Sequence, residues 1–261
     1  MMLNQQLIAT HLSPSVPLES QGIHVFETVT STNQILWELL DAGKTPPLVA
    51  IAAQQTAGRG QWGRSWYSPP GGLYLSLALT LNLRAVNASH LTLFSAWGIA
   101  KALHKHNLPI KLKWPNDLIL EGRKLGGIKS ETRIQQGIIY QGIIGIGINW
   151  DNPVPDTGIN LQSFFKAQQK TLIPSLEALA GLTIQGLFEG YQYYCSQGIE
   201  WLLKDYLTML ESLGRTVMIE GATGIITGVT PQGELKVSLK APGAKTEIHL
   251  PPGSISLGYE Q

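Results

Sequence analysis

The sequence predicts an α+β protein: a mixed, largely antiparallel sheet packed with helices, followed by a compact β module. Three observations lead to this fold class. Residues 23–213 mix apolar stretches of strand period with stretches of helical period. Short turns join three of the later strands, so antiparallel neighbours are expected. Five short strand-like segments fill residues 215–257, which is typical of a small β-barrel.

The first half of the chain is expected to alternate strands and helices. Residues 1–22 are polar with scattered prolines and predict a loose N-terminal arm. Ile23–Val29 alternates apolar and polar residues like a strand, and Thr30 or Ser31 is placed to cap a helix that ends at Asp41. The next predicted elements are strands at Pro47–Gln55 and Gly72–Leu81 and a helix at Ser89–His106.

The second half begins with strands and then becomes helical. Strands are predicted at Ile110–Trp114, Leu118–Leu120, Lys124–Thr132 and Ile138–Ile148. Asp151–Gln162 is rich in Pro, Asp, Asn and Gly and predicts a loop, and Ser175–Leu213 predicts two helices parted near Ser196–Gly198. The domains expected are therefore 23–213 and 214–261. The strands of the second are predicted at Thr216–Glu220, Gly224–Thr230, Leu235–Leu239, Thr246–Leu250 and Ser254–Leu257.

Composition excludes several classes of function. The net charge is +1 over 261 residues, so no bulk charge attracts nucleic acid or a membrane surface. The N-terminus shows no signal peptide, and no apolar stretch is long enough to cross a bilayer. The single cysteine, Cys195, fits a reducing compartment, and we expect it to be packed in the core of a cytoplasmic protein. The six histidines lack metal-site spacing.

The segment from Gly58 to Trp66 carries the strongest chemical signal. It holds three glycines, two arginines and two tryptophans in nine residues. Glycines let backbone approach a ligand closely, arginine forks fit phosphate oxygens, and indoles cover apolar surface. A loop of this composition suits a small ligand that has an apolar body and an anionic part. The alternative is a basic surface loop.

Three further segments point in the same direction. They are Lys111–Leu120, with Trp-Pro-Asn-Asp; Glu121–Ile128, in which lysine precedes Leu-Gly-Gly; and Gly145–Trp150, with Gly-Ile-Gly-Ile-Asn. Together with Thr-Ser-Thr-Asn at residues 30–33, the four segments resemble the biotin protein ligases. That family shows a GRGRxGRxW loop, a KWPND strand, a KL(A/G)GI strand and a GxGIN strand in this order. The resemblance covers residues 23–257.

The resemblance implies a fold, an activity and partners. The fold is that of the class II synthetase and biotin ligase type, ending in an SH3-like barrel. The activity is ATP-dependent conversion of biotin to biotinyl-5'-AMP, and then transfer of biotin to a lysine of the biotin carboxyl carrier protein of acetyl-CoA carboxylase. ATP and Mg²⁺ are needed. Members that also repress transcription have an N-terminal winged helix, and only about 22 residues precede the catalytic region here. Specific DNA binding is therefore not expected, and a homodimer is left open.

The resemblance also assigns roles to residues. Lys124 would contact the biotin carboxylate and the α-phosphate, Arg59 would hold phosphate, and Asp117 would act as a base or Mg²⁺ ligand. The alternatives from the residues alone are a solvated strand-end lysine, a turn at Asn116–Asp117 and a plain helix cap at Ser31. The residues expected to bind biotin are Ser31, Thr32, Asn33, Gln55, Gly58, Arg59, Trp66, Lys124 and Gly127. Those expected to bind the nucleotide are Arg59, Arg64, Lys113, Asn116, Asp117 and Asn149.

Two positions depart from the family pattern. Gln61 stands where the family often has a third loop arginine, so the tight retention of biotinyl-AMP is open to question. Gly258 stands where some members carry an arginine that reaches the nucleotide, which leaves the role of the C-terminal module open. The rival readings are a lipoate or octanoate ligase on the same fold and a non-catalytic biotin sensor. Pyrophosphate exchange would separate an enzyme from a sensor.

Overall fold

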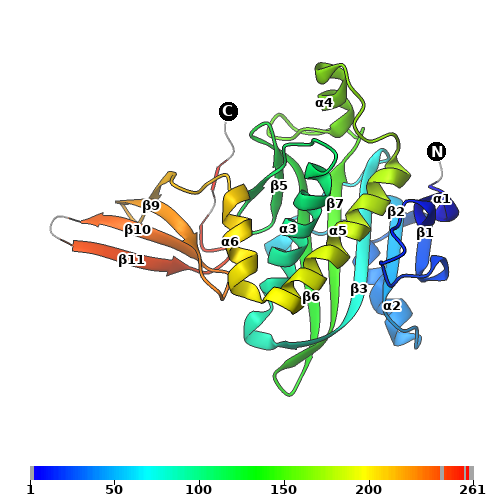
Figure 1. Cartoon of the computed structure of the whole chain (residues 1–261), viewed down its shortest axis with the longest axis horizontal. Coiled ribbons are helices and arrows are strands. Elements are labelled where there is room, and N and C mark those ends of the chain that lie inside the picture. The colour runs from blue at the N-terminus through cyan, green and yellow to red at the C-terminus, as the bar shows by residue number, and fades with distance from the viewer. Residues whose placement is uncertain (1–2, 242–243, 256, 259–261) are drawn as a thin grey trace.

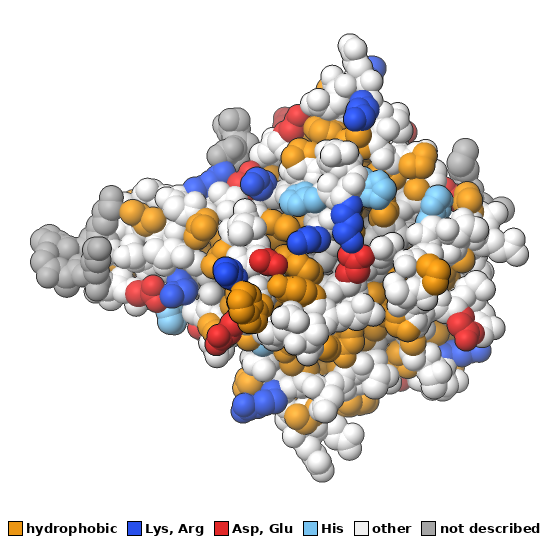
Figure 2. Space-filling view, viewed as in Figure 1, with side chains coloured by type: hydrophobic (Ala, Val, Ile, Leu, Met, Phe, Trp, Pro, Cys, Tyr) orange, Lys and Arg blue, Asp and Glu red, His pale blue; other side chains and the backbone are white. Residues whose placement is uncertain are grey.

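The computed structural model describes residues 3–241, 244–255 and 257–258. These residues form a seven-stranded sheet with helices on both faces, and a four-stranded sheet that projects from one end of this body (Figure 1). The predicted α+β class is therefore confirmed. On the face seen in Figure 2, basic and acidic side chains are interspersed, as the net charge of +1 suggests.

The large sheet has the strand order β1-β2-β3-β7-β6-β5-β4. β1 and β2 are parallel, and every other pair of neighbours is antiparallel. Each predicted strand of this region is present; β1 has the predicted ends, and the ends of the others differ from the prediction by up to three residues. The strands are β1 (Ile23–Val29), β2 (Leu48–Gln55), β3 (Gly72–Arg84), β4 (Lys111–Lys113), β5 (Asp117–Leu120), β6 (Arg123–Gln135) and β7 (Ile138–Asn149).

Helices cover the two faces of this sheet unequally. α2 (Thr32–Asp41) covers one face, where Leu36 and Leu40 pack against Ala78 and Ile143. The opposite face carries α3 (His90–His104), α5 (Leu176–Gln197) and α6 (Ile199–Met209), as Figure 1 shows. The predicted break between the last two helices is confirmed, because Gly198 adopts φ +82° between them.

Two helices were not predicted. α1 (Gln5–Thr10) lies within the expected loose arm, which is a wrong prediction: Ile8 is fully buried in the core, and Asn4 accepts a hydrogen bond from the amide of Leu7. α4 (Leu161–Gln168) begins inside the expected loop, where the side chain of Asn160 accepts a bond from the amide of Ser163. Short 3-10 turns lie at Ser20–Gly22, Gln61–Gly63 and Ala85–Asn87.

The C-terminal sheet is a meander with the strand order β11-β10-β9-β8. Consecutive strands pair antiparallel, and in the described ranges no pairing joins β8 to β11, so a closed barrel is not confirmed. The fifth strand expected at Ser254–Leu257 is not formed by its described residues, and Ser256 lies outside them. The strands are β8 (Thr216–Ile219), β9 (Ala222–Val229), β10 (Leu235–Ala241) and β11 (Ala244–Leu250).

One prediction about the core is wrong. Cys195 is exposed: the last buried residue of α5 is Gly190, and beyond it only the large rings of Tyr191, Tyr193 and Tyr194 still pack against the core. Among the described residues, no helix is long and apolar enough to cross a membrane. No cluster of three or more His, Cys, Asp or Glu side chains arranged to hold a metal occurs in that part of the chain either.

Candidate active site

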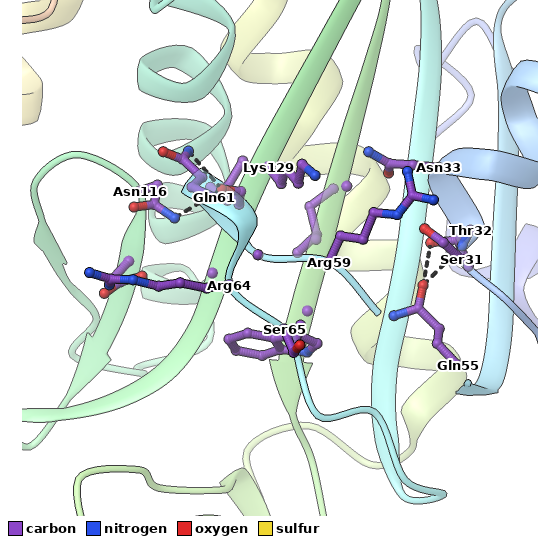
Figure 3. A pocket seen from close by; sticks show the side chains of 18 of the residues that line it. Ser31, Thr32, Asn33, Gln55, Arg59, Gln61, Arg64, Ser65, Asn116 and Lys129 are labelled. Atoms are coloured by element: carbon purple, nitrogen blue, oxygen red, sulfur yellow. Dashed lines mark hydrogen bonds between the residues drawn. The ribbon is translucent and has the colours of Figure 1, made fainter. Parts of the chain in front are cut away.

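A pocket opens between the start of α2, the loop that follows β2, and strands β6 and β7 (Figure 3). It brings together side chains from four separate sequence motifs. The predicted site residues that line it are Ser31, Thr32, Asn33, Gln55, Arg59, Arg64, Trp66, Asn116, Asp117, Lys124 and Gly127.

One end of the pocket is a buried polar network. The side-chain amide oxygen of Gln55, Oε1, accepts hydrogen bonds from Thr32 N (2.9 Å) and Thr32 Oγ1 (3.2 Å). Ser76 Oγ lies 2.7 Å from Thr32 Oγ1 and 2.6 Å from Asn33 Oδ1. Ser31 occupies the N-cap position of α2, yet its hydroxyl makes no capping bond to the described backbone. Its hydroxyl therefore does not do the work of a plain helix cap.

Glycines of β7 make room for this end of the pocket. A Cβ at Gly145 would lie 2.4 Å from Asn33 Oδ1, and one at Gly147 would lie 2.4 Å from Trp66 Nε1. Both positions face the same side of the sheet as Ile143, because side chains alternate along a strand. Glycine at these two positions therefore lets the asparagine of α2 and the indole of the loop lie directly on the sheet.

Lys124 and Asp117 form an ion pair in the middle of the pocket. Lys124 Nζ lies 2.6 Å from Asp117 Oδ1 and 5.3 Å from the centre of the Trp66 ring. Both side chains are largely covered, with 27% and 12% of their surface exposed. The pocket thus holds a positive and a negative group that both reach the same ligand-sized space.

A β-bulge puts Lys124 on this face. The pairing of β5 with β6 shifts between Leu118, which faces Gly126, and Ile119, which faces Lys124. Strict alternation would send Lys124 and Gly127 to opposite faces, because they are three residues apart. The extra residue at Leu125 cancels that difference, as bulges beside functional sites often do. Lys124 Cε and a Cβ built at Gly127 are consequently only 3.6 Å apart.

The loop after β2 folds back on itself over the pocket. Trp66 N donates to Gly58 O at 2.9 Å, and Gly60 N donates to Arg64 O at 2.6 Å. Gly58 must be glycine here, since a Cβ would lie 2.4 Å from Trp66 O. Figure 3 shows the guanidinium of Arg59 directed towards Asn33 and that of Arg64 on the opposite side, below Asn116. The two arginines therefore reach different ends of the pocket.

Three predicted site residues do not line this pocket. Gly58 instead lies against the backbone of Trp66, within the loop. Asn149 is buried, and its amide donates to Lys124 O (3.3 Å) and Ile159 O (3.2 Å), so it holds the backbone of Lys124 in place. Lys113 borders a neighbouring cavity beside Arg215, and burial there lowers the pKa of its ammonium to about 8.

Lys129 is a pocket residue that sequence reasoning missed. Its ammonium lies 3.2 Å from Glu131 Oε1, and Glu131 also accepts a bond from Trp37 Nε1 at 2.8 Å. Burial alone raises the pKa of Glu131, but the hydrogen bonds from Trp37 and Lys129 bring it below its usual range. The two-residue spacing from Gly127 is the signal that would have found Lys129, since both lie on one face of β6.

Comparison with known proteins agrees with this site. Residues 25–149 match the Biotin/lipoate A/B protein ligase family. The chain is 30% identical over 224 residues to the Bifunctional ligase/repressor BirA of Escherichia coli (strain K12). The aligned region covers 84% of this chain and 70% of that protein. It is 34% identical over 111 residues to the Biotin--[acetyl-CoA-carboxylase] ligase of Paracoccus denitrificans, over 41% of this chain and 46% of the relative.

Solved structures share the fold. The biotin protein ligase from Aquifex aeolicus in complex with biotin and ATP superposes with a TM-score of 0.67 at 23% identity, over 87% of this chain and 94% of that one. The biotin protein ligase from Leishmania major in complex with biotin gives 0.63 at 24% identity, over 87% and 98%. The chain belongs to the Biotin/lipoate A/B protein ligase family, and within it to the biotin protein ligases.

Proposed function

We propose that this chain activates biotin with ATP and transfers it to a lysine of a biotin carboxyl carrier protein, as in acetyl-CoA carboxylase. In the first step a biotin carboxylate oxygen attacks the α-phosphorus, the bond to the β-phosphate oxygen breaks, and pyrophosphate leaves. In the second step the lysine amine attacks the acyl carbon, the acyl–oxygen bond breaks, AMP leaves, and the amine loses a proton.

The observation that carries this proposal is the position of Lys124. Its ammonium stands in the middle of the pocket, 5.3 Å from the Trp66 ring, with a polar network at one end and the arginine loop above. The first step brings two anions together, so positive charge placed where they meet stabilises the transition state. Asp117, at 2.6 Å, holds the ammonium in this place before the substrates bind.

The polar end suits the ureido ring of biotin. That ring presents one carbonyl acceptor and two N–H donors, and each one left unpaired in a buried site costs about 1–3 kcal/mol. Ser31 and Thr32 supply hydroxyls, Asn33 and Gln55 supply amides, and Trp66 and Gly127 border the apolar part. Octanoate has no ureido group and would offer these polar side chains no hydrogen-bonding partner. The lipoate or octanoate alternative is therefore the weaker one.

Phosphate binding is assigned to Arg64, which lies near Asn116, and to Arg59 once its guanidinium turns from Asn33 towards the nucleotide. Lys113 adds a positive charge that interacts with Asp117 from the neighbouring cavity. Mg²⁺ is commonly held by one or two carboxylates together with substrate phosphates, and the pocket offers the carboxylate of Asp117 beside the amide of Asn116. These residues fit the ion, which when bound would neutralise charge on the phosphate oxygens. Asp117 is also placed to accept the proton of the acceptor lysine, whose pKa of about 10.4 keeps it charged at neutral pH.

The same proposal includes four further points. They are a domain boundary at residues 213–214, an SH3-like character for the C-terminal sheet, a cytoplasmic location and a homodimer. In this proposal Asn149 acts on the nucleotide indirectly, because its amide holds the backbone of Lys124.

Biotin-dependent exchange of labelled pyrophosphate into ATP tests the first step, and labelling of a purified carrier domain with biotin tests the second. We expect both with biotin and neither with octanoate. A folded protein that catalyses no biotin-dependent exchange would contradict the proposal, and exchange with octanoate alone would favour the rival ligase.

A further inference from the structure

Trp62, at the tip of the arginine loop, rests on the C-terminal module. Its backbone is left-handed, with φ 52° and ψ 42°, and half of the residue (51%) is exposed. The covered part lies on Gly253, in the turn that follows β11. A Cβ at Gly253 would lie 2.6 Å from Trp62 Nε1 and 2.7 Å from Cε2. The indole and this turn are therefore in direct contact.

In the loop that follows β2, hydrogen bonds across a hairpin couple the position of Trp62 at the tip to the positions of Arg59 and Arg64. Arg59 pairs with Ser65 in an isolated bridge, and the 2.6 Å bond from Gly60 N to Arg64 O closes a narrow hairpin with Trp62 at its end. Gln61 Nε2 donates to Ile128 O at 3.1 Å and ties the hairpin to β6. Arg59 and Arg64 thus flank the residue that touches the C-terminal module.

The C-terminal module is a fixed support for this contact. Its β9–β10 turn, residues 231–233, is fastened to the catalytic body by three hydrogen bonds. Ser89 Oγ donates to Gln232 O (2.7 Å), and Trp114 Nε1 donates to Gly233 O (2.9 Å). The His90 ring bonds to Pro231 O at 2.6 Å. A sheet held in this way cannot move freely away from the loop.

The turn at residues 251–254 has a shape that accommodates an indole. Ser254 N and Ser254 Oγ both bond to Pro251 O, at 3.1 and 2.7 Å, and close the turn. Gly253 has φ +94°, which other residues rarely adopt, and it leaves the surface under the ring flat. Pro252 borders the same groove as Trp62, together with Pro115 and Leu93.

We propose that residues 251–254 form a seat for Trp62 which holds the arginine loop over the pocket, so that Trp62 is a positioning residue for Arg59 and Arg64. The inference rests on the proposed function and extends it. Gln61 lacks the charge that an arginine would direct at the nucleotide, and the seat replaces part of that hold by a contact outside the pocket. It gives the C-terminal module a definite role, which is to keep biotinyl-AMP from leaving before transfer.

The test compares Trp62→Ala, Trp62→Phe, Gly253→Val and the Trp62→Ala/Gly253→Val pair with Trp201→Ala. Trp201 is a similarly exposed tryptophan (55%) on α6, away from the loop, and serves as the matched control. Two quantities are measured. One is the rate of trypsin cleavage after Arg59 and Arg64 in the ligand-free protein, and the other is the rate at which preformed biotinyl-AMP leaves the enzyme in a chase.

Contacting residues couple by roughly 0.5–3 kcal/mol, so Trp62→Ala should speed both rates by about 2- to 160-fold. Trp62→Phe keeps a ring at this position and should stay close to the parent in both rates, and Trp201→Ala should leave both rates unchanged. The Trp62→Ala/Gly253→Val double variant should be no faster than Trp62→Ala alone. Pro252→Ala replaces Gly253→Val if the latter does not fold. Equal rates in Trp62→Ala and Trp201→Ala, or additive effects in the pair, would overturn the proposal. If no variant, parent included, forms biotinyl-AMP, the proposed function fails, while the cleavage rates still decide whether the seat exists.

Discussion

The indole of Trp66 lies flat against Gly147 in the middle of the large sheet. A Cβ at Gly147 would be 2.4 Å from Trp66 Nε1 and 2.5 Å from Cε2. Glycine inside a strand costs stability, because it has more backbone freedom to lose on folding. Its presence here is explained by the ring it admits, which in turn lies 5.3 Å from the Lys124 ammonium.

Gly147→Ala should therefore damage the pocket more than the fold. Even one extra methyl in a packed site forces neighbours to shift at a cost of about 1–3 kcal/mol, and the neighbour that can move is Trp66. We expect weaker biotin binding, by about tenfold, in calorimetry. Gly258→Ala is the control, since no atom of the described residues lies within 4 Å of its new methyl. Equal biotin affinity in both variants would show that Trp66 does not shape the site.

Gln55→Ala should weaken biotin binding and also lower stability. Thr32 N and Oγ1 both donate to Gln55 Oε1 of the side-chain amide, so the variant leaves a buried donor without an acceptor. Such a loss costs about 1–3 kcal/mol. The free energy of unfolding in urea and the KM for biotin should both change, whereas Gln54→Ala, one residue earlier on β2, should change neither. An unaltered KM for biotin with reduced stability would assign Gln55 to the fold alone.

The strands and most helices follow from period and composition, but the common orientation of Lys124 and Gly127 does not. It depends on the bulge opposite Leu118, which the pattern of apolar residues does not reveal. Lys129 was missed for the opposite reason: its regular two-residue spacing from Gly127 was visible, but a lysine on a half-exposed strand is usually solvated. Motif spacing therefore locates the pocket, while local irregularity decides which side chains enter it.

Tertiary packing accounts for the remaining differences. α1 is too short to be stable alone and depends on packing, with Ile8 fully buried. Cys195 continues an aromatic run that predicts burial, but only the tyrosine rings of that run reach the core, and the small thiol stays exposed. Asn149 carries a motif position, yet the distances show it bonded to the backbone of Lys124. Each of these outcomes depends on a partner distant in the sequence, which a local pattern does not contain.

Stability should fall below about pH 6.5 because of His90. The residue is 2% exposed, and burial lowers its pKa from 6.5, although the bond to Pro231 O opposes this. Below pH 6.5 the unfolded chain takes up a proton that the folded chain resists, so the free energy of unfolding decreases with falling pH until the folded pKa is passed. His24 acts in the same direction. Urea midpoints should fall less between pH 7 and 5 in His90→Gln than in the parent; identical slopes would contradict this.

Gly98→Ala should destabilise the helical layer. The helices α3 and α5 cross so closely that the new methyl would lie 2.0 Å from Gly186 O and 2.9 Å from Gly190 Cα. Backbone cannot yield as a side chain does, so the cost should reach or exceed the usual 1–3 kcal/mol of overpacking, which for a domain of this size lowers the melting temperature by about 2–4 °C for each kcal/mol. Gln192→Ala, on the exposed side of α5, should melt with the parent. A Gly98→Ala variant as stable as the parent would mean that the helices lie further apart.

Lys124→Ala should cripple formation of biotinyl-AMP while leaving the fold intact. The ammonium is proposed to neutralise two anions as they meet, an interaction strongest in the transition state. Removing one such contact typically costs about 2.7–4 kcal/mol, or roughly 10²–10³ in rate. Single-turnover formation of the intermediate and a melting curve should be recorded together. Lys105→Ala is the control, because that lysine is also paired with a carboxylate, at 2.8 Å from Glu189, but lies on the surface with 54% of its side chain exposed.

The ion pair with Asp117 sharpens this test. Removing Lys124 leaves a largely covered carboxylate in the pocket, so some of the effect would come from the stranded charge rather than from lost catalysis. Lys124→Ala/Asp117→Asn removes both charges, and with them the proposed Mg²⁺ ligand. Recovery of adenylation in the double variant would show that the stranded carboxylate caused the loss, whereas a double variant at least as slow as Lys124→Ala agrees with lost neutralisation of the substrates. Formation of the intermediate by Lys124→Ala within about threefold of the parent rate would refute the central role given to this residue.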